Sequence, residues 1–275
     1  MIKPVEIQNK AREVGVRDQQ IEKDYILSWV LQGIAQHEQL STTITFKGGT
    51  VLKKVYFENY RFSEDLDFTL LDDDISNEQI FEWFSEVFEY IRDKANIPLE
   101  IIDKDEQEAP CLPDQQDGIN FYISYVGPLG GIGANKRVKV DISRSEQLQF
   151  ESVMQNTYPG YSDQEDHQLL CYPLEEILIE KLRSIMQRMQ ARDFYDIWYL
   201  LEIHEMDIAF YSIEFRAKCR SKKIDPTDFH NKLEQRLPKY KGRWKASMAD
   251  QIQDLPDFDQ VEREVMRHLK RLELP

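Results

Sequence analysis

The sequence has few cysteines and no long apolar run, and both shortages exclude classes of protein. Its three cysteines, Cys111, Cys171 and Cys219, are far apart and lack CxxC or Cys/His spacing, which argues against a disulfide framework and a zinc site. No uninterrupted apolar stretch approaches the roughly 18 residues that span a membrane, and residues 1–16 contain no apolar signal core. We therefore expect a soluble cytoplasmic protein with no membrane association.

An excess of positive charge is also lacking. The 275 residues carry a formal net charge of −15, which is unfavourable for an enzyme that binds a polyanion. Residues 216–245 are an exception, because they contain eleven Lys and Arg against three Asp and Glu, interleaved with Phe229, Tyr240 and Trp244. This basic segment is typical either of RNA binding with base stacking or of a solvated basic helix pair that balances an acidic body.

The pattern over residues 44–70 predicts a strand, a glycine turn, a short helix and a second strand. Gly48 and Gly49 supply the backbone freedom for a tight turn. Asp65 and Asp67 lie two residues apart in the second strand, so both carboxylates project from one face. Paired carboxylates on a rigid strand suit Mg2+ or Mn2+. The N–H groups of the turn and of the following helix would form a cradle for phosphates.

These residues carry a resemblance to a known family. Gly48-Gly49-Thr50, followed by residues 61–68 (RFSEDLDF), resembles the nucleotidyltransferase motif of the AbiEii/AbiGii-type abortive-infection toxins, within the polymerase-beta-like superfamily. Further matches are residues 21–25 (IEKDY), 176–181 and 191–196 (ARDFYD), so the likeness spans roughly residues 20 to 200. A DxD pair alone is a weak signal, whereas the combination of these motifs is much more specific. Thr50 replaces the superfamily's frequent Ser but keeps a hydroxyl.

A candidate third carboxylate lies in residues 137–143, whose alternating apolar and polar side chains predict a strand with Asp141 on its polar face. The resemblance implies that an acid from a later strand completes the metal site or deprotonates the attacking hydroxyl. The alternative is an ordinary polar-face aspartate in a hairpin. The glycine-rich residues 127–133 match neither the P-loop nor the dinucleotide-binding spacing, so we expect a mobile hairpin loop near the active site.

Two further motif residues lie in predicted helices after Pro173. By spacing alone, Lys181 and Asp193 indicate surface ion pairs. The resemblance implies instead that Lys181 meets the triphosphate and that Asp193 orients this lysine or the acceptor. It likewise implies that Arg61 and Ser63 contact phosphates or hold the loop, although Arg61 could simply pair with Glu58 or Glu64.

Elsewhere the periodicity predicts helices over residues 3–14, 17–36 and 77–94, and strands over 99–102 and 119–126. In the second helix, Glu22, Lys23 and Asp24 lie off the apolar stripe, and we expect them on a solvated face. An exposed loop over 103–118 and a linker over 151–167 complete the interpretation.

The combined prediction is an α/β (α+β) protein, with a minimal polymerase-beta-like mixed sheet flanked by helices and an all-helical C-terminal lobe. The expected parts are N-terminal helices over 1–40, the nucleotidyltransferase domain over 41–150 and a helical domain over 151–275. The resemblance implies a toxin of a type IV toxin–antitoxin or phage-defence pair, with a separately encoded antitoxin.

The implied activity is metal-dependent transfer of a nucleoside monophosphate from an NTP to an RNA hydroxyl, with the 3′ end of tRNA as the leading acceptor and pyrophosphate as the leaving group. The alternatives are a protein or small-molecule hydroxyl as acceptor, or a non-catalytic nucleotide-binding module. The candidate residues, all read from the sequence, are Asp65, Asp67, Asp141, Lys181 and Asp193 for catalysis; Gly48, Gly49, Thr50, Arg61, Ser63 and Lys181 for the nucleotide; Asp65, Asp67 and Asp141 for Mg2+ or Mn2+; and Lys239, Lys241, Arg243 and Lys245 for RNA.

Overall fold

The computed structural model describes residues 1–107, 118–133, 135–158 and 160–274, and the chain divides into two compact units. Unit 1 comprises Met1–Glu146 and Ser152–Cys171, and unit 2 comprises Gln147–Glu151 and Tyr172–Pro275. Among the described residues no helix is both long enough and apolar enough to cross a membrane.

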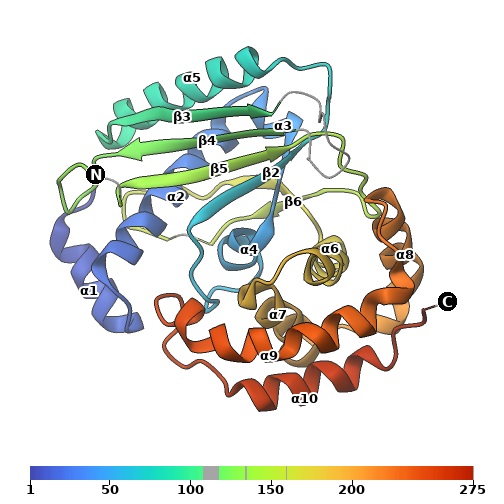
Figure 1. Ribbon diagram of the computed structural model, residues 1–275. Helices are drawn as coiled ribbons and strands as arrows, with labels where there is room; N and C mark the ends of the chain where they lie inside the picture. The colour runs from blue at the N-terminus through green and yellow to red at the C-terminus, as the bar shows by residue number, and fades with distance from the viewer. Residues whose placement is uncertain (108–117, 134, 159, 275) are drawn as a thin grey trace. The chain divides into compact units, whose positions relative to one another are not determined.

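A seven-stranded mixed sheet forms the body of unit 1, in the order β3-β4-β5-β2-β1-β7-β6 (Figure 1). Four strand pairs are antiparallel, while β2–β5 and β1–β7 are parallel. This sheet confirms the predicted fold class. Its strands are β1 (Ile44–Lys47), β2 (Asp65–Leu70), β3 (Leu99–Gln107), β4 (Gly118–Tyr125), β5 (Arg137–Ser143), β6 (Val153–Asn156) and β7 (Gln168–Cys171).

Helix α5 covers the apolar face of this sheet beside β3 and β4 (Figure 1). Its N-terminus is capped by the Ser76 hydroxyl, which accepts from the Gln79 N–H. Its buried stripe places Phe84 edge-on against Phe121 of β4, with ring centroids 5.1 Å apart. The other helical segments of unit 1 are α1 (Pro4–Val14), α2 (Asp18–Gln36), α3 (Leu40–Thr43), α4 (Gly48–Val51) and a π-helical turn (Leu52–Tyr56), and α5 itself spans Asn77–Ala95.

The strand register separates an apolar face from a polar face. On β4 and β5, Phe121 lies opposite Val140, and Val140 in turn lies opposite Leu66 of β2. All three are fully buried. Side chains alternate along each strand, so the intervening residues share the other face. That polar face carries Lys47, Asp65, Asp67, Asn120, Tyr122, Lys139 and Asp141.

Two segments differ from the sequence-based expectation. The expected linker over 151–167 contains β6, and β7 follows it, joining the sheet beside β1 through the pair Phe46 and Cys171. The expected loop over 103–118 is also shorter, because β3 continues to Gln107 and pairs with β4 across a register shift. The remainder of that expected loop, residues 108–117, lies outside the described residues.

The charged residues of α2 correct another expectation. Glu22 is fully buried and Asp24 is 3% exposed, so neither lies on a solvated face. The Glu22 carboxylate accepts from the Leu129 N–H at 2.8 Å and pairs with the Lys136 ammonium. Asp24 pairs with Lys54 at 2.7 Å. A buried charge needs such a partner, and these partners are 30 or more residues away in the sequence.

The regular secondary structure in the described part of unit 2 is helical. A buried ion pair joins Lys218 and Glu176 at 2.8 Å, and the same carboxylate accepts from the N–H groups of Gln149 and Phe150. The helices are α6 (Leu174–Gln187), α7 (Ala191–Trp198), α8 (Ser212–Ser221), α9 (Phe229–Met248) and α10 (Phe258–Leu269), with shorter turns at Tyr199–Ile203, Ile208–Tyr211 and Pro226–Asp228.

The aromatic residues of the basic segment belong to the core of unit 2. Phe229, Tyr240 and Trp244 of α9 are at most 2% exposed. Tyr240 stacks on Phe194 of α7 with ring centroids 5.4 Å apart, and the Trp244 indole donates to the Pro256 carbonyl. Of the two alternatives for the basic segment, stacking of RNA bases on these rings is therefore wrong, because helical periodicity turns the rings inward while Lys239, Lys241, Arg243 and Lys245 stay exposed.

Candidate functional site

Three acids gather on the polar face of the unit 1 sheet. Asp65 and Asp67 project together from β2, and Asp141 of β5 lies opposite Asp67 in the parallel register. Register partners in a sheet are about 4.8 Å apart, so the carboxylates of Asp67 and Asp141 share one neighbourhood. Among the described residues, no group of three or more Asp, Glu, His or Cys side chains is arranged closely enough to hold a metal ion as the side chains stand.

Lys139 supplies positive charge to this acidic face. It lies opposite Asp65 in the register, and its ammonium is 3.2 Å from Asp141 Oδ2. Burial disfavours the charged ammonium, but the carboxylates of Asp141, Asp67 and Asp65 outweigh burial and raise the pKa of Lys139. The three carboxylates therefore create a negative potential that favours a positive charge at Lys139.

The glycine turn closes against the acids. Gly48 has φ +82°, and a Cβ there would lie 2.3 Å from Asp67 Oδ2. A Cβ on Gly49 would lie 2.6 Å from an Arg61 guanidinium nitrogen. Only glycine allows this backbone conformation and both close approaches. The turn is therefore packed directly between the acid pair and a buried arginine.

Two neighbouring residues have specific structural contacts. Arg61 is 2% exposed, and its guanidinium donates to the Phe62 carbonyl at 3.2 Å. The Thr50 hydroxyl donates to the Asp65 carbonyl at 2.5 Å, which ties the start of α4 to β2. Ser63 is buried, 6% exposed, in the segment that leads into Asp65.

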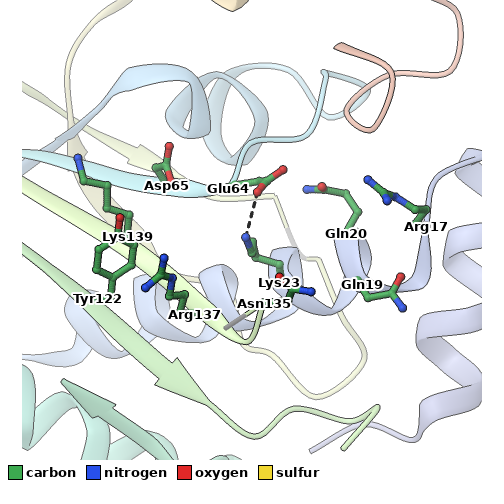
Figure 2. A pocket seen from close by; sticks show the side chains of 10 residues that line it. All are labelled: Arg17, Gln19, Gln20, Lys23, Glu64, Asp65, Tyr122, Asn135, Arg137 and Lys139. Atoms are coloured by element: carbon green, nitrogen blue, oxygen red, sulfur yellow. Dashed lines mark hydrogen bonds and ion pairs between the residues drawn. The ribbon is translucent and has the colours of Figure 1, made fainter. Parts of the chain in front are cut away.

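A pocket of about 690 Å3 opens beside Asp65. Its walls come from the start of α2, from the segment before β2, and from β4 and β5 (Figure 2). Lys23 reaches across and pairs with Glu64 at 2.9 Å. The lining residues are Arg17, Gln19, Gln20, Lys23, Glu64, Asp65, Tyr122, Asn135, Arg137 and Lys139.

Lys181 and Asp193 meet within unit 2. The buried Lys181 ammonium lies 2.8 Å from Asp193 Oδ1 and 2.8 Å from Asp196 Oδ2. Arg188 donates to both oxygens of Asp193, at 2.7 and 3.1 Å. Burial acts to raise the pKa of Asp193, but Lys181 and Arg188 overcome it and hold the pKa below its usual value. The lysine and the aspartate therefore pair, but in a buried network and not in the surface ion pair that spacing alone indicated.

The four candidate RNA-binding residues are exposed on α9. Lys241 pairs with Asp259 of α10 at 2.6 Å, so part of this basic surface is balanced within unit 2. Because Phe229, Tyr240 and Trp244 are buried, the exposed surface of α9 can attract a ligand through charge but not by stacking on these rings.

Most residues that line the pocket are not among those that the sequence predicts for the site. Lys139 shows a usable signal, because it precedes Asp141 by two residues in an alternating strand and therefore shares its face. Arg17, Gln20 and Tyr122 show none, since only the tertiary packing of α2 and β4 places them beside Asp65.

Comparisons with known proteins fit this geometry. The sequence matches the family described as "Nucleotidyl transferase AbiEii toxin, Type IV TA system" over residues 29–264. A search among curated proteins found no match.

Solved structures share the fold. JHP933 from Helicobacter pylori is 16% identical with a TM-score of 0.58, over 94% of this chain and 93% of that one. MenT4, the nucleotidyltransferase toxin Rv2826c from Mycobacterium tuberculosis H37Rv, is 18% identical with a TM-score of 0.60, over 99% and 90%. At these identities the structures support the fold, while the family match covers most of the chain. The chain belongs to the AbiEii family of nucleotidyltransferase toxins of type IV toxin–antitoxin systems.

Proposed function

We propose that this protein transfers a nucleoside monophosphate from an NTP to an RNA hydroxyl, at the 3′ end of tRNA. The acceptor oxygen forms a bond to the α-phosphorus, the bond from that phosphorus to the bridging oxygen breaks, and pyrophosphate leaves. Asp141 takes the proton of the acceptor hydroxyl. The observation that carries the proposal is the shared face of Asp65, Asp67 and Asp141 with the Gly48 turn packed against it.

Asp65, Asp67 and Asp141 would hold Mg2+ or Mn2+. The donor set fits, because carboxylate oxygens are the ligands that these hard cations prefer. The face also favours a cation, since the three acids together raise the pKa of Lys139. Once bound, the ion would neutralise charge that develops on the phosphates.

The phosphates of the NTP would lie on the glycine turn. Backbone N–H groups at Gly48 and Gly49, with Ser63, form the proposed cradle, and the Arg61 guanidinium beneath Gly49 supplies positive charge. We assign Thr50 a positioning role, because its hydroxyl already donates to the Asp65 carbonyl. In unit 2, Lys181 is the proposed contact to the triphosphate, oriented by Asp193.

The wider setting follows from the family. A type IV toxin has an antitoxin, and we propose that it is encoded separately and that the pair acts in phage defence. The exposed Lys239, Lys241, Arg243 and Lys245 would attract the phosphates of a bulky RNA through charge alone.

The test is incubation of the purified protein with each α-labelled NTP, Mg2+ and total RNA, followed by a denaturing gel. Asp65→Asn/Asp67→Asn is the control, because it keeps the shape of both side chains and removes their charge. We expect label on a tRNA-sized band with the wild type alone. Label on protein or on a small molecule instead would overturn the acceptor assignment. No label on any acceptor would overturn the transferase proposal.

A further inference from the structure

The pocket beside Asp65 carries a local excess of positive charge. Four cationic side chains, Arg17, Lys23, Arg137 and Lys139, line it with two acids, Glu64 and Asp65, although the whole chain has a net charge of −15. Lys23 pairs with Glu64, and outside the lining Arg137 pairs with the exposed Asp103 and Lys139 with Asp141. Such a concentration in a concave site attracts an anion and raises its local concentration. An anionic ligand is therefore favoured at Arg17, Lys23 and Arg137, whereas the acids of β2 and β5 beside Lys139 favour a cation.

Gln20 gives a second, independent indication of a ligand. Its side chain is 7% exposed, lines the pocket and points toward the Glu64 side of it (Figure 2). Within the described part of the chain, the Gln20 amide Nε2 meets no hydrogen-bond acceptor. A buried donor without an acceptor destabilises the free protein, and a ligand oxygen in the pocket would satisfy it.

The pocket also offers a surface for a nucleobase. The half-buried Tyr122 of β4 lies on its wall, and the Arg137 guanidinium sits 4.3 Å from the centre of the Tyr122 ring. Tyrosine rings and arginine planes are the usual stacking partners of unpaired RNA bases. Cationic side chains and a stacking surface thus occur together in this pocket.

The position of the pocket in the sheet favours the RNA acceptor over the NTP donor as its ligand. The glycine turn follows β1 and contacts Asp67, whereas Tyr122, Arg137 and Lys139 come from β4 and β5. In the sheet order β4-β5-β2-β1, the acids of β2 lie between these two flanks. If the NTP binds at the glycine turn beside β1, the other side of the acids, formed by β4 and β5, is left for the RNA acceptor, next to Asp141.

We propose that this pocket seats the unpaired 3′-terminal nucleotides of the RNA acceptor. The cations Arg17, Lys23 and Arg137 neutralise its phosphates, Tyr122 stacks a base, and Gln20 donates to an oxygen of the bound strand. The inference rests on the proposed function in that it names the acceptor subsite of the same reaction.

The first test measures binding without catalysis. A labelled single-stranded RNA that matches a tRNA 3′ end is titrated with protein in EDTA without NTP, at several salt concentrations, and followed by fluorescence anisotropy. For Arg17→Gln/Arg137→Gln we expect Kd to rise about tenfold or more and the slope of log K against log salt to fall by about 1.4, since each lost contact to a single strand removes about 0.7. Lys94→Gln, an exposed lysine on α5, is the matched control.

A parallel titration with an α,β-methylene NTP in Mg2+ identifies the alternative occupant. Unchanged affinity for this analogue in the double variant supports the assignment. Loss of its affinity with RNA binding intact would make the pocket the donor site and overturn the proposal. So would RNA binding that is equal in the double variant and the wild type, or absent from both.

Gln20→Met refines the test, because it removes the amide donor and keeps the volume. We expect RNA affinity to fall by up to about tenfold, while the melting temperature of the free protein stays the same or rises. A lowered melting temperature with unchanged RNA affinity would mean that the amide is structural. If the wild type binds RNA through this pocket and transfers no nucleotide to it, the proposed function fails while the pocket assignment stands.

Discussion

Asp141 of β5 lies directly opposite Asp67 of β2, and its carboxylate is held by the Lys139 ammonium at 3.2 Å. The pair comes from strands 74 positions apart in the chain, so the parallel β2–β5 register creates the acidic face. The position of the Asp141 carboxylate therefore depends on its ion pair with Lys139.

Asp141→Asn tests the proposed general base. We expect kcat for nucleotide transfer to fall by about 10² to 10⁴, which is the usual contribution of a positioned base, with the NTP KM nearly unchanged. Single-turnover transfer at saturating NTP is the measurement, with the exposed Asp254→Asn as control. A raised NTP KM with unchanged kcat would instead place Asp141 in nucleotide binding.

Gly48→Ala tests the packing of the turn against Asp67. An alanine at φ +82° is strained, and its Cβ would displace the Asp67 carboxylate. Gly131→Ala is a matched control, because Gly131 has φ +78° with nothing within 4 Å of its Cβ position. Both variants should lose about 1 kcal/mol of stability from the backbone. Only Gly48→Ala should also lower transfer activity, by about tenfold or more if Asp67 holds a catalytic metal. Equal activity losses would contradict this reading.

Local periodicity was sufficient for much of the fold. The strand expected over 137–143 is β5 (Arg137–Ser143), and the helix expected over 77–94 is α5 (Asn77–Ala95). The strand has a strong period-2 pattern and the helix a strong period-3.6 pattern, each with one buried face. The shared face of Asp65 and Asp67 follows from the same alternation, so this part of the candidate site could be predicted from neighbouring residues alone.

The remainder depends on residues that are distant in the sequence. β7 has four residues and pairs locally with β6, but it joins the rest of the sheet through parallel pairing with β1, more than 100 positions earlier. No local pattern reports the pairing with β1. Glu22 is buried because Lys136 pairs with it, so its charge alone wrongly indicated solvent. In α9, the surrounding lysines and arginines left RNA stacking open for Trp244, whereas helical periodicity buries its ring.

The two described cysteines should be unreactive in the folded protein. Burial raises the pKa of the Cys219 thiol to about 12, and it raises the pKa of Cys171 further. The thiolate is the nucleophile, so at pH 8 neither thiol should react quickly with DTNB. The measurement uses Cys111→Ser, because Cys111 lies outside the described residues. Two fast-reacting thiols should appear only after denaturation, and a fast phase in native protein would contradict the burial.

Lys181→Met tests the buried network of unit 2. Two buried carboxylates, Asp193 and Asp196, would lose a shared cation. We expect a loss of about 3 to 5 kcal/mol in the free energy of unfolding, measured in urea. Lys181→Met/Asp196→Asn should recover part of this loss. If the double variant regains stability but not transfer activity, Lys181 acts on the substrate as well; if it regains both, the role of Lys181 is structural.

Acid should weaken the same network through Asp193. Its folded pKa is held below the ordinary value of 3.8, so its contribution to stability is fully present above pH 3.8 and is lost as the pH falls through the folded pKa. Asp193→Asn lacks this titration, whereas every other carboxylate is common to both proteins. The wild type should therefore be more stable than the variant by about 2 kcal/mol near pH 7. That difference should shrink once the pH drops below about 4, in urea unfolding measured from pH 3 to 7. A difference that stays constant down to pH 3 would mean that the ion pairs with Lys181 and Arg188 do not stabilise the fold.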